Sequence, residues 1–230
     1  TRIQSLQKLY ALAAMCFWGE GIDSRAFSGF YGVDSSNQVP DGDTIGRFQA
    51  LLVKQGLQES LFAQVVALLQ ARGLILKKGT IVDSTIISAP SSTKNKEKKR
   101  DPDAHQTKKG NTWHFGYKAH IGVDKTSGLT HHVEVTAANV HDVTVVPKLL
   151  HGEEESVHGD SGYLGAHKRE DAVTHNHRGK KIQYKINRRP SQCKNTSVRS
   201  KGQIKRRERD TSYVRAKVEH VFAVVKGLFG

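Results

Sequence analysis

The stretch Gly79–Ser88, with the sequence GTIVDSTIIS, is the part of the chain that decides the fold. It is rich in β-branched and apolar residues, which favour a pleated and largely buried conformation. We therefore predict a buried strand over 80–87. Asp83 follows the first apolar run of this strand, where a buried scaffold would present its carboxylate to a ligand.

Two further acids occupy comparable positions. Asp160 follows a short predicted strand over 156–158, and Glu219 lies in a predicted helix over 214–229. At about 100° per residue, Arg215, Glu219 and Lys226 share one stripe of this helix. That stripe borders the apolar face, so Glu219 is expected at the edge of the core, partly desolvated yet reachable. The apolar face comprises Val214, Val218, Val221, Phe222, Val225, Leu228 and Phe229.

Three carboxylates from two strands and a helix can hold two divalent cations for phosphodiester chemistry. Hard cations such as Mg²⁺ take carboxylate oxygens and keep positions for phosphate and water. Arg215 and Lys226 would then neutralise phosphate oxygens. Each acid alone also has a plainer explanation. Aspartate commonly opens turns, and Arg215 and Glu219 stand at the spacing of a helical ion pair.

The N-terminal part of the chain is predicted to be helical. Asp43 is suited to cap a helix that stops at Gly56, and apolar residues recur at helical spacing over 59–72. Gly73 ends this second helix. Residues 29–42 are predicted to form a loop.

From Gly79 onward the pattern changes to strands interspersed with helices, which predicts an α/β (α+β) fold with a mixed sheet covered by helices. Gly128 suits the turn of a hairpin, and Asp142 is suited to cap a helix. We predict a helical region over 1–78 and a catalytic domain over 79–230. The predicted strands are 80–87, 114–123, 131–136, 156–158 and 181–186, the helices are 142–150, 164–173 and 214–229, and the main loops are 91–111 and 188–210.

Composition narrows the class of partner. The formal net charge is +14 and the pI is about 9.8, a balance that favours a polyanion such as nucleic acid. Cys16 and Cys193 have neither zinc-ribbon spacing nor the number of a disulfide framework, which fits a reducing cytoplasm. The longest apolar run, 9–18, is too short to span a bilayer, so no membrane partner is expected.

Basic and aromatic residues suggest where nucleic acid would bind. Residues 178–209 hold thirteen Lys or Arg against one Glu, and the loop over 91–111 is rich in lysine. Trp113, with its neighbours His114 and Tyr117, can stack on an unpaired base, although ordinary sheet packing explains Trp113 better. The sequence has no H-E-x-x-H motif, which argues against a zinc hydrolase.

Five segments together resemble the DDE transposases of bacterial insertion sequences: GTIVDSTIISAPSSTKNK, HFGYKAHIGVD, TAANVHDV, GDSGYLG and YVRAKVEHVFAVVK. The nearest group is that of insertion sequence five, within the insertion-sequence-four-like superfamily. This resemblance implies a ribonuclease H-like core, two Mg²⁺ ions for which Mn²⁺ can substitute, and cleavage and joining at transposon ends. It also implies terminal inverted repeats and target DNA as partners, paired protomers, and a nucleoid-associated location. The family's proteins extend further, so the chain is expected to be truncated at both ends.

The resemblance also assigns site residues. Asp83, Asp160 and Glu219 match the family's catalytic and metal-binding triad. Tyr213, Arg215, Glu219 and Lys226 match its Y-R-E-K signature, although one residue separates Tyr213 from Arg215 where the pattern has two. A ribonuclease H-like nuclease and an inactive DNA-binding remnant remain as alternatives. The residues expected to contact DNA are Arg215, Lys226, Tyr213, Lys94, Lys96, Lys98, Lys99, Arg100, Lys118, Arg188, Arg189, Arg206 and Arg207.

Overall fold

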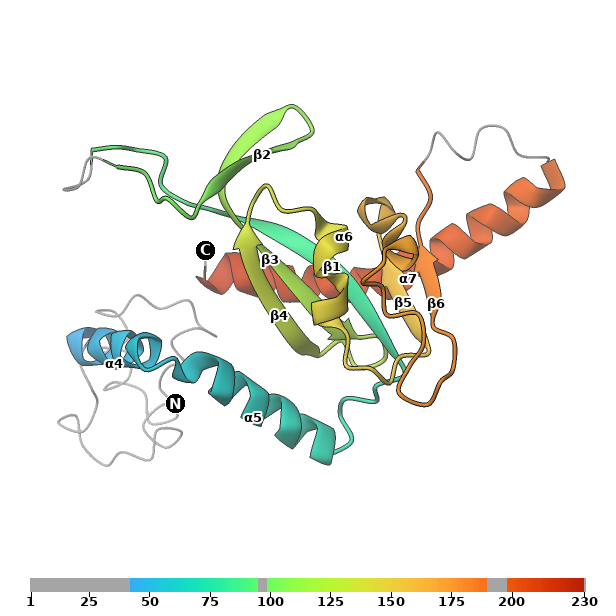
Figure 1. The fold of residues 1–230 in the computed structure, drawn as a ribbon, viewed down its shortest axis with the longest axis horizontal. Coiled ribbons are helices and arrows are strands. Elements are labelled where there is room, and N and C mark those ends of the chain that lie inside the picture. The colour runs from blue at the N-terminus through green and yellow to red at the C-terminus, as the bar shows by residue number, and fades with distance from the viewer. Residues whose placement is uncertain (1–41, 95–98, 190–197, 230) are drawn as a thin grey trace, which may run out of the picture. The chain divides into compact units, whose positions relative to one another are not determined.

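The computed structural model of the protein describes residues 42–94, 99–189 and 198–229 (Figure 1). Residue contacts divide the chain into two compact units, one of Thr1–Leu68 with Ala223–Gly230 and the other of Leu69–Phe222. The predicted loop over 29–42 lies outside the described residues, apart from Gly42, which begins a helix.

The two predicted N-terminal helices are confirmed. They are α4, Gly42–Lys54, and α5, Leu57–Ala71. Gly56 and Gly73 follow their C-terminal ends with φ of 62° and 67°. Glycine adopts this left-handed conformation at little cost, and it stops a helix cleanly.

The larger unit is built on a mixed sheet, as predicted, in the order β2-β3-β1-β5-β6, with β4 also paired to β3. The central strand β1 pairs antiparallel with β3 and parallel with β5. This mixed α/β architecture is consistent with a ribonuclease H-like core. The strands are β1 Gly79–Ser88, β2 His105–Lys109, β3 Thr112–Asp124, β4 Thr130–Ala137, β5 Ser156–Gly159 and β6 Gln183–Ile186.

Helices cover the sheet on both faces. On one face lies α7, Val198–Phe229, whose Val218 is fully buried against Ile81 of β1 and Val123 of β3. On the other face lie α6, Asp142–Val145, and short 3-10 turns, which pack with Val82 and Tyr163. Figure 1 shows α6 in front of the sheet and α7 passing behind it. A segment placed between two such layers must be apolar, which explains the composition of β1.

Four sequence-based predictions are wrong. The predicted loop over 91–111 contains β2, and the predicted helix over 164–173 is replaced by a 3-10 turn at Ala166–Lys168. The predicted loop over 188–210 gives way to α7 from Val198 onward. Asp142 does not cap a helix through its side chain, because His141 is the N-cap of α6 and makes no side-chain cap bond.

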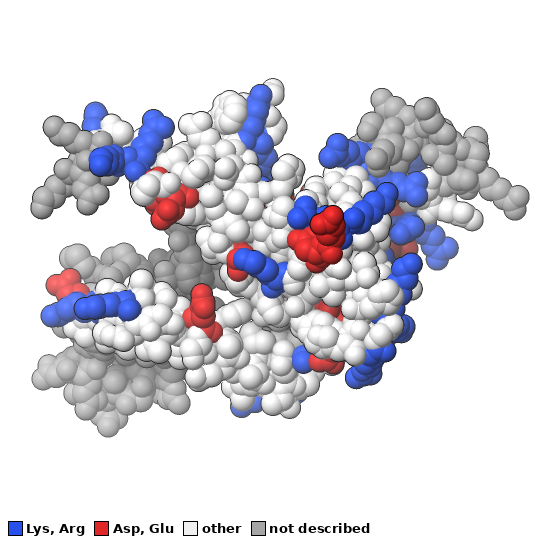
Figure 2. All heavy atoms as spheres, viewed as in Figure 1, with Lys and Arg blue, Asp and Glu red and all other residues white. Residues whose placement is uncertain are grey.

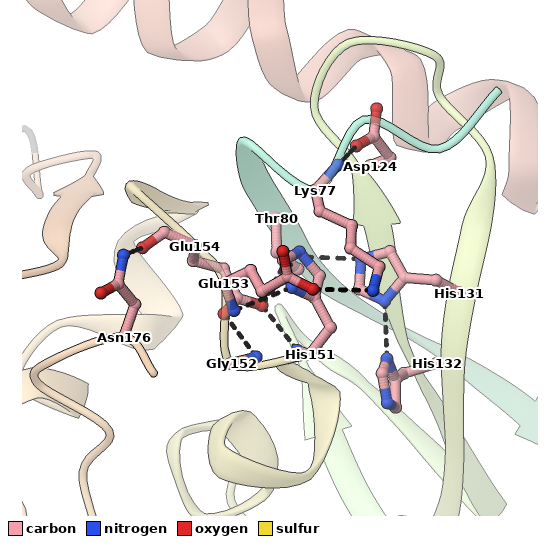
Figure 3. Close-up of polar contacts among 10 residues, drawn as sticks. All are labelled: Lys77, Thr80, Asp124, His131, His132, His151, Gly152, Glu153, Glu154 and Asn176. Carbon is pink, nitrogen blue, oxygen red and sulfur yellow. Dashed lines mark hydrogen bonds and ion pairs between the residues drawn. The ribbon is translucent and has the colours of Figure 1, made fainter. Parts of the chain in front are cut away.

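A buried histidine cluster joins the N-terminal end of β1 to β4 and the segment before β5 (Figure 3). His131 places its Nε2 3.2 Å from Thr80 Oγ1 and its Nδ1 2.6 Å from His132 Nδ1. The Thr80 hydroxyl donates to the fully buried Glu154 at 3.0 Å. His151 packs edge-on against His131, with ring centroids 5.1 Å apart.

Acid is expected to unfold the protein through this cluster. Burial, helped by His132 and His151, lowers the pKa of His131 to about 3. Burial also lowers the pKa of His158 to about 4. A histidine of the unfolded chain titrates near about 6.5, so below that pH the unfolded state binds more protons than the folded state. The histidine contribution is therefore complete above about pH 6.5 and falls progressively as the pH decreases, toward about pH 4 for His158 and about pH 3 for His131.

Urea denaturation at pH 8, 7, 6 and 5 measures this effect. The free energy of unfolding should be level from pH 8 to 7 and should decline below that. His131→Gln should weaken the decline, whereas a matched change at the exposed His141 should leave it intact. An unfolding free energy that stays constant from pH 7 to 5 would contradict the expectation.

Candidate active site

Asp83 and Asp160 occupy matching positions on adjacent parallel strands. The register pairs Thr80 with Val157 and Ile81 with His158. Continued for two residues, it sets Asp83 opposite Asp160. Parallel neighbours lie about 4.8 Å apart, and side chains alternate between the two faces of a sheet. Since Ile81 faces α7, Asp83 faces α7 as well.

Local structure holds each aspartate. The side chain of Asp83 accepts a hydrogen bond from the backbone N–H of Ser84 at 2.8 Å. Asp160 directly follows β5 and is the N-cap of a 3-10 turn at Ser161–Tyr163, where its Oδ1 accepts from the Gly162 N–H at 2.8 Å. Asp160 therefore combines the expected turn role with a position beside Asp83.

Arg215 of α7 reaches Asp83 across the sheet face. Its Nη2 donates to Asp83 Oδ2 at 3.0 Å, and both side chains are largely buried. Burial raises the pKa of Asp83, against the lowering effect of Arg215, and the nearby Asp160 raises it further. The Nε of Arg215 is buried and has no hydrogen-bond partner among the described residues. The guanidinium is therefore in contact with Asp83, and its Nε remains an unused donor among the described residues.

Glu219 lies one helical turn after Arg215 and is exposed. Four residues correspond to about 40° of rotation, so Glu219 projects from nearly the same side of α7. In the described part of the chain, no group of three or more His, Cys, Asp or Glu side chains is arranged to hold a metal ion. The structure thus brings together Asp83, Asp160 and Arg215, whereas Glu219 is exposed one turn further along α7 and joins no such group among the described residues.

Sequence reasoning missed a second charged pair, Lys118 with Asp142, beside the middle of β1. Asp142 accepts from Ser84 Oγ at 3.1 Å and from Lys118 Nζ at 3.0 Å. Asp142 contacts Ser84, and Ser84 is the residue after Asp83 in β1. Asp83 and Asp142 therefore lie on opposite faces of the same strand. Tyr163 is buried near both acids and Asp160, which together raise its pKa after burial itself. The sequence predicts only a helix cap for Asp142, because its spacing from the other acids gives no sign of its contacts with Ser84 and Lys118.

The other residues expected to bind DNA lie in different surroundings. Lys118 is engaged with Asp142 and with the Val140 carbonyl oxygen. Tyr213 is 79% exposed on α7. Lys226 lies beyond Phe222, in the other unit. Lys96 and Lys98 fall outside the described residues, whereas the side chains of Lys94, Lys99, Arg100, Arg188, Arg189, Arg206 and Arg207 are exposed.

Trp113 does not pack in the sheet as predicted. It is 64% exposed, and Lys108 Nζ lies 5.9 Å from its ring centroid. This arrangement leaves the indole face accessible, and Lys108 gains a favourable contact with the ring. Stacking on a base is therefore sterically open to Trp113.

A family model described as the transposase DDE domain matches residues 75–230, which is more than half of the chain. The match begins just before β1 and includes Asp83, Asp160 and α7. No solved structure matches the chain. Within the described ranges, every helix is too short or too polar to cross a membrane. The matched region and the sheet that carries the two aspartates lead to one conclusion: the chain belongs to the transposase DDE domain family.

Proposed function

We propose that the protein is a DNA transposase that cuts at the ends of a mobile element and joins those ends to target DNA. The observation that carries this proposal is the proximity of Asp83 in β1 to Asp160, which directly follows the adjacent strand β5, with Arg215 in contact with Asp83. The family match supports it. We further propose that the protein belongs to the insertion sequence five group, and that it comprises a helical region over 1–78 and a catalytic domain over 79–230.

Asp83, Asp160 and Glu219 are the proposed catalytic and metal-binding residues. Their oxygen donors fit Mg²⁺, which usually takes one or two carboxylates from a protein and completes its shell with phosphate and water. Two Mg²⁺ ions, or Mn²⁺ in their place, would activate the attacking oxygen and stabilise the leaving oxygen. Asp83 and Asp160 supply the two central carboxylates, and Glu219 completes the set from α7.

Arg215 has the contacts to respond to an incoming phosphate. Its Nη2 donates to Asp83, while its buried Nε has no acceptor in the part of the chain that the structure describes. A phosphate oxygen would satisfy Nε and favour a bidentate contact. Arg215 would then orient the scissile phosphate over the aspartates, and such positioning supplies much of the catalysis in phosphoryl transfer.

The remaining basic residues and Tyr213 are proposed to hold DNA outside the reacting centre. The protein would act as paired protomers on terminal inverted repeats and target DNA, in association with the nucleoid. The proposed contacts come from Tyr213, Lys226, Lys94, Lys96, Lys98, Lys99, Arg100, Lys118, Arg188, Arg189, Arg206 and Arg207.

The test is cleavage and joining of duplexes that carry the inverted repeats found in DNA flanking the coding region. With Mg²⁺, the protein should expose a 3′-hydroxyl at the repeat and transfer it into a plasmid, and EDTA should stop both steps. Glu219→Gln should reduce both products strongly, whereas Glu155→Gln, a change at an exposed glutamate, should not. Cleavage without joining would indicate a nuclease, and binding without cleavage would indicate an inactive remnant. Either result would overturn the proposal.

A further inference from the structure

A groove of about 780 Å³ opens between strands β5 and β6 and the N-terminal half of α7. We call it the basic groove. Its floor includes His158 of β5 and Lys185 of β6, and one wall is formed by Arg206 and Arg207 of α7. Lys125, from the turn after β3, closes one end. All of these residues belong to the unit Leu69–Phe222.

Charge in the basic groove is strongly one-sided. Four cationic side chains line it, from Lys125, Lys185, Arg206 and Arg207, against the single carboxylate of Asp210. Figure 2 shows Lys and Arg side chains gathered over β6 and the first part of α7. Cations gathered along a concave surface raise the local concentration of an anionic ligand. The positive charge continues beyond the groove through the exposed Arg188 and Arg189, so a polymeric anion suits it better than a single small ion.

One buried ring nitrogen in the basic groove, Nδ1 of His158, has no hydrogen-bond partner among the described residues. His158 is only 3% exposed, and its Nε2 lies 3.1 Å from Ser156 Oγ. Its Nδ1 is buried with no hydrogen-bond partner among the described residues. An unpaired buried polar atom is costly, and native proteins rarely leave one. If the Ser156 hydroxyl donates to Nε2, the neutral imidazole carries its hydrogen on Nδ1 and can donate it to an anion.

The surroundings of His158 agree with an anion at this position. Lys125 and Lys185 line the same groove as the imidazole of His158. An anionic oxygen placed there would accept from Nδ1 and would screen the two ammonium groups from each other.

We propose that the basic groove binds the sugar–phosphate backbone of DNA, with a phosphate oxygen accepting a hydrogen bond from Nδ1 of His158. This inference rests on the proposed function and extends it to the path of the substrate. His158 and Asp160 lie on the same face of β5, two residues or about 6.6 Å apart. A strand held in the groove would therefore present a neighbouring phosphate to the acid pair.

The experiment measures binding of a labelled random-sequence duplex in EDTA, over a range of salt concentrations. The logarithm of the affinity falls with the logarithm of the salt concentration by about 0.9 per phosphate contact. Lys185→Gln with Arg207→Gln should therefore reduce the slope by roughly 2 and lower affinity at least about tenfold at low salt. Lys148→Gln is the matched control, since this exposed lysine lies on a 3-10 turn at the opposite face of the sheet. An unchanged slope in the double variant would overturn the inference.

A second readout concerns His158 directly. In ¹⁵N-histidine-labelled protein, the Nδ1 resonance of His158 should shift when the duplex is added. It should remain in place with the same concentration of inorganic phosphate. A saturable shift with phosphate alone would show a single-anion site and would overturn the proposed backbone path.

Failure of this inference and failure of the proposed function give different results. Asp83→Asn should abolish cleavage while leaving the salt slope unchanged. If cleavage depends on Asp83 but the groove variants bind normally, only the groove assignment is wrong. If the groove variants lose affinity while Asp83→Asn still cleaves, only the catalytic assignment is wrong.

Discussion

Asp83→Asn is expected to reduce metal-dependent cleavage by roughly 10³-fold or more, because it removes a charged oxygen donor at the centre of the acid pair. The fold should survive this change. Burial raises the pKa of Asp83, so the folded protein disfavours the charge that the substitution removes. Removing a buried charge stabilises the fold, whereas losing the ion pair with Arg215 destabilises it, so the two effects on stability oppose each other. We expect a melting temperature within about 4 °C of the parent.

Asp171→Asn is the matched control for this loss of charge. Asp171 also pairs with an arginine, Arg169, at 2.8 Å, but both side chains are exposed. Exposed pairs contribute little, so neither cleavage nor melting should change measurably. Cleavage by the Asp83 variant at more than a tenth of the parent rate, under single-turnover conditions, would remove Asp83 from the active site.

Glu154→Ala is expected to cost about 3–5 kcal/mol of unfolding free energy, the largest stability effect we predict. Glu154 is fully buried and accepts from the backbone N–H groups of His151 at 2.7 Å and Gly152 at 2.8 Å. It also accepts from the Thr80 hydroxyl at 3.0 Å. Alanine would leave the two backbone N–H groups without this acceptor and would remove one of the two partners of the Thr80 hydroxyl.

Urea denaturation of Glu154→Ala beside Glu155→Ala isolates this effect. Glu155 is the next residue, and its side chain forms an exposed pair with Lys180 at 3.3 Å. Its loss should change stability by less than about 1 kcal/mol. Glu154→Gln keeps one oxygen acceptor and should fall between the two. Equal midpoints for the two alanine variants would show that the buried contacts of Glu154 contribute no net stability.

Buried strands could be predicted from sequence because burial leaves a composition signal. The run around Ile81 is apolar since α7 covers one face of β1 and the 3-10 turns cover the other. By contrast, β2 is polar and mostly exposed on both sides, so it has neither an apolar run nor alternation. Its strand conformation comes from pairing with β3, which is a tertiary effect.

The two errors in helices have separate causes. Residues 198–213 are so polar that they lack a clear amphipathic pattern, yet they continue the helix that Val214 and Val218 anchor to the sheet. Over 164–173 an apolar pattern is present, but Gly165 has a φ of 90° and interrupts any regular helix. Propensity alone does not settle either segment.

The two aspartates of the candidate site could be predicted from the sequence, but most of their contacts could not. Asp83 and Asp160 could be found because each follows an apolar run, and the parallel pairing of β1 with β5 sets them side by side. The contact between Arg215 and Asp83 spans 132 positions in the sequence, and helix geometry alone pairs Arg215 with Glu219 instead. Asp142 and His158 depend on packing between distant segments, which no local pattern records.

The matched register of β1 and β5 has a consequence for how such proteins tolerate insertions. The length of chain between the two strands is free to vary, because extra residues in an exposed connection leave the ladder intact. Within 79–83 the count is fixed. One added residue there would rotate Asp83 to the opposite side of the sheet while the surrounding β-rich composition stayed almost the same. Relatives of this protein should therefore differ widely in the spacing of their acids along the chain, yet keep the same number of residues from the start of each strand to its aspartate.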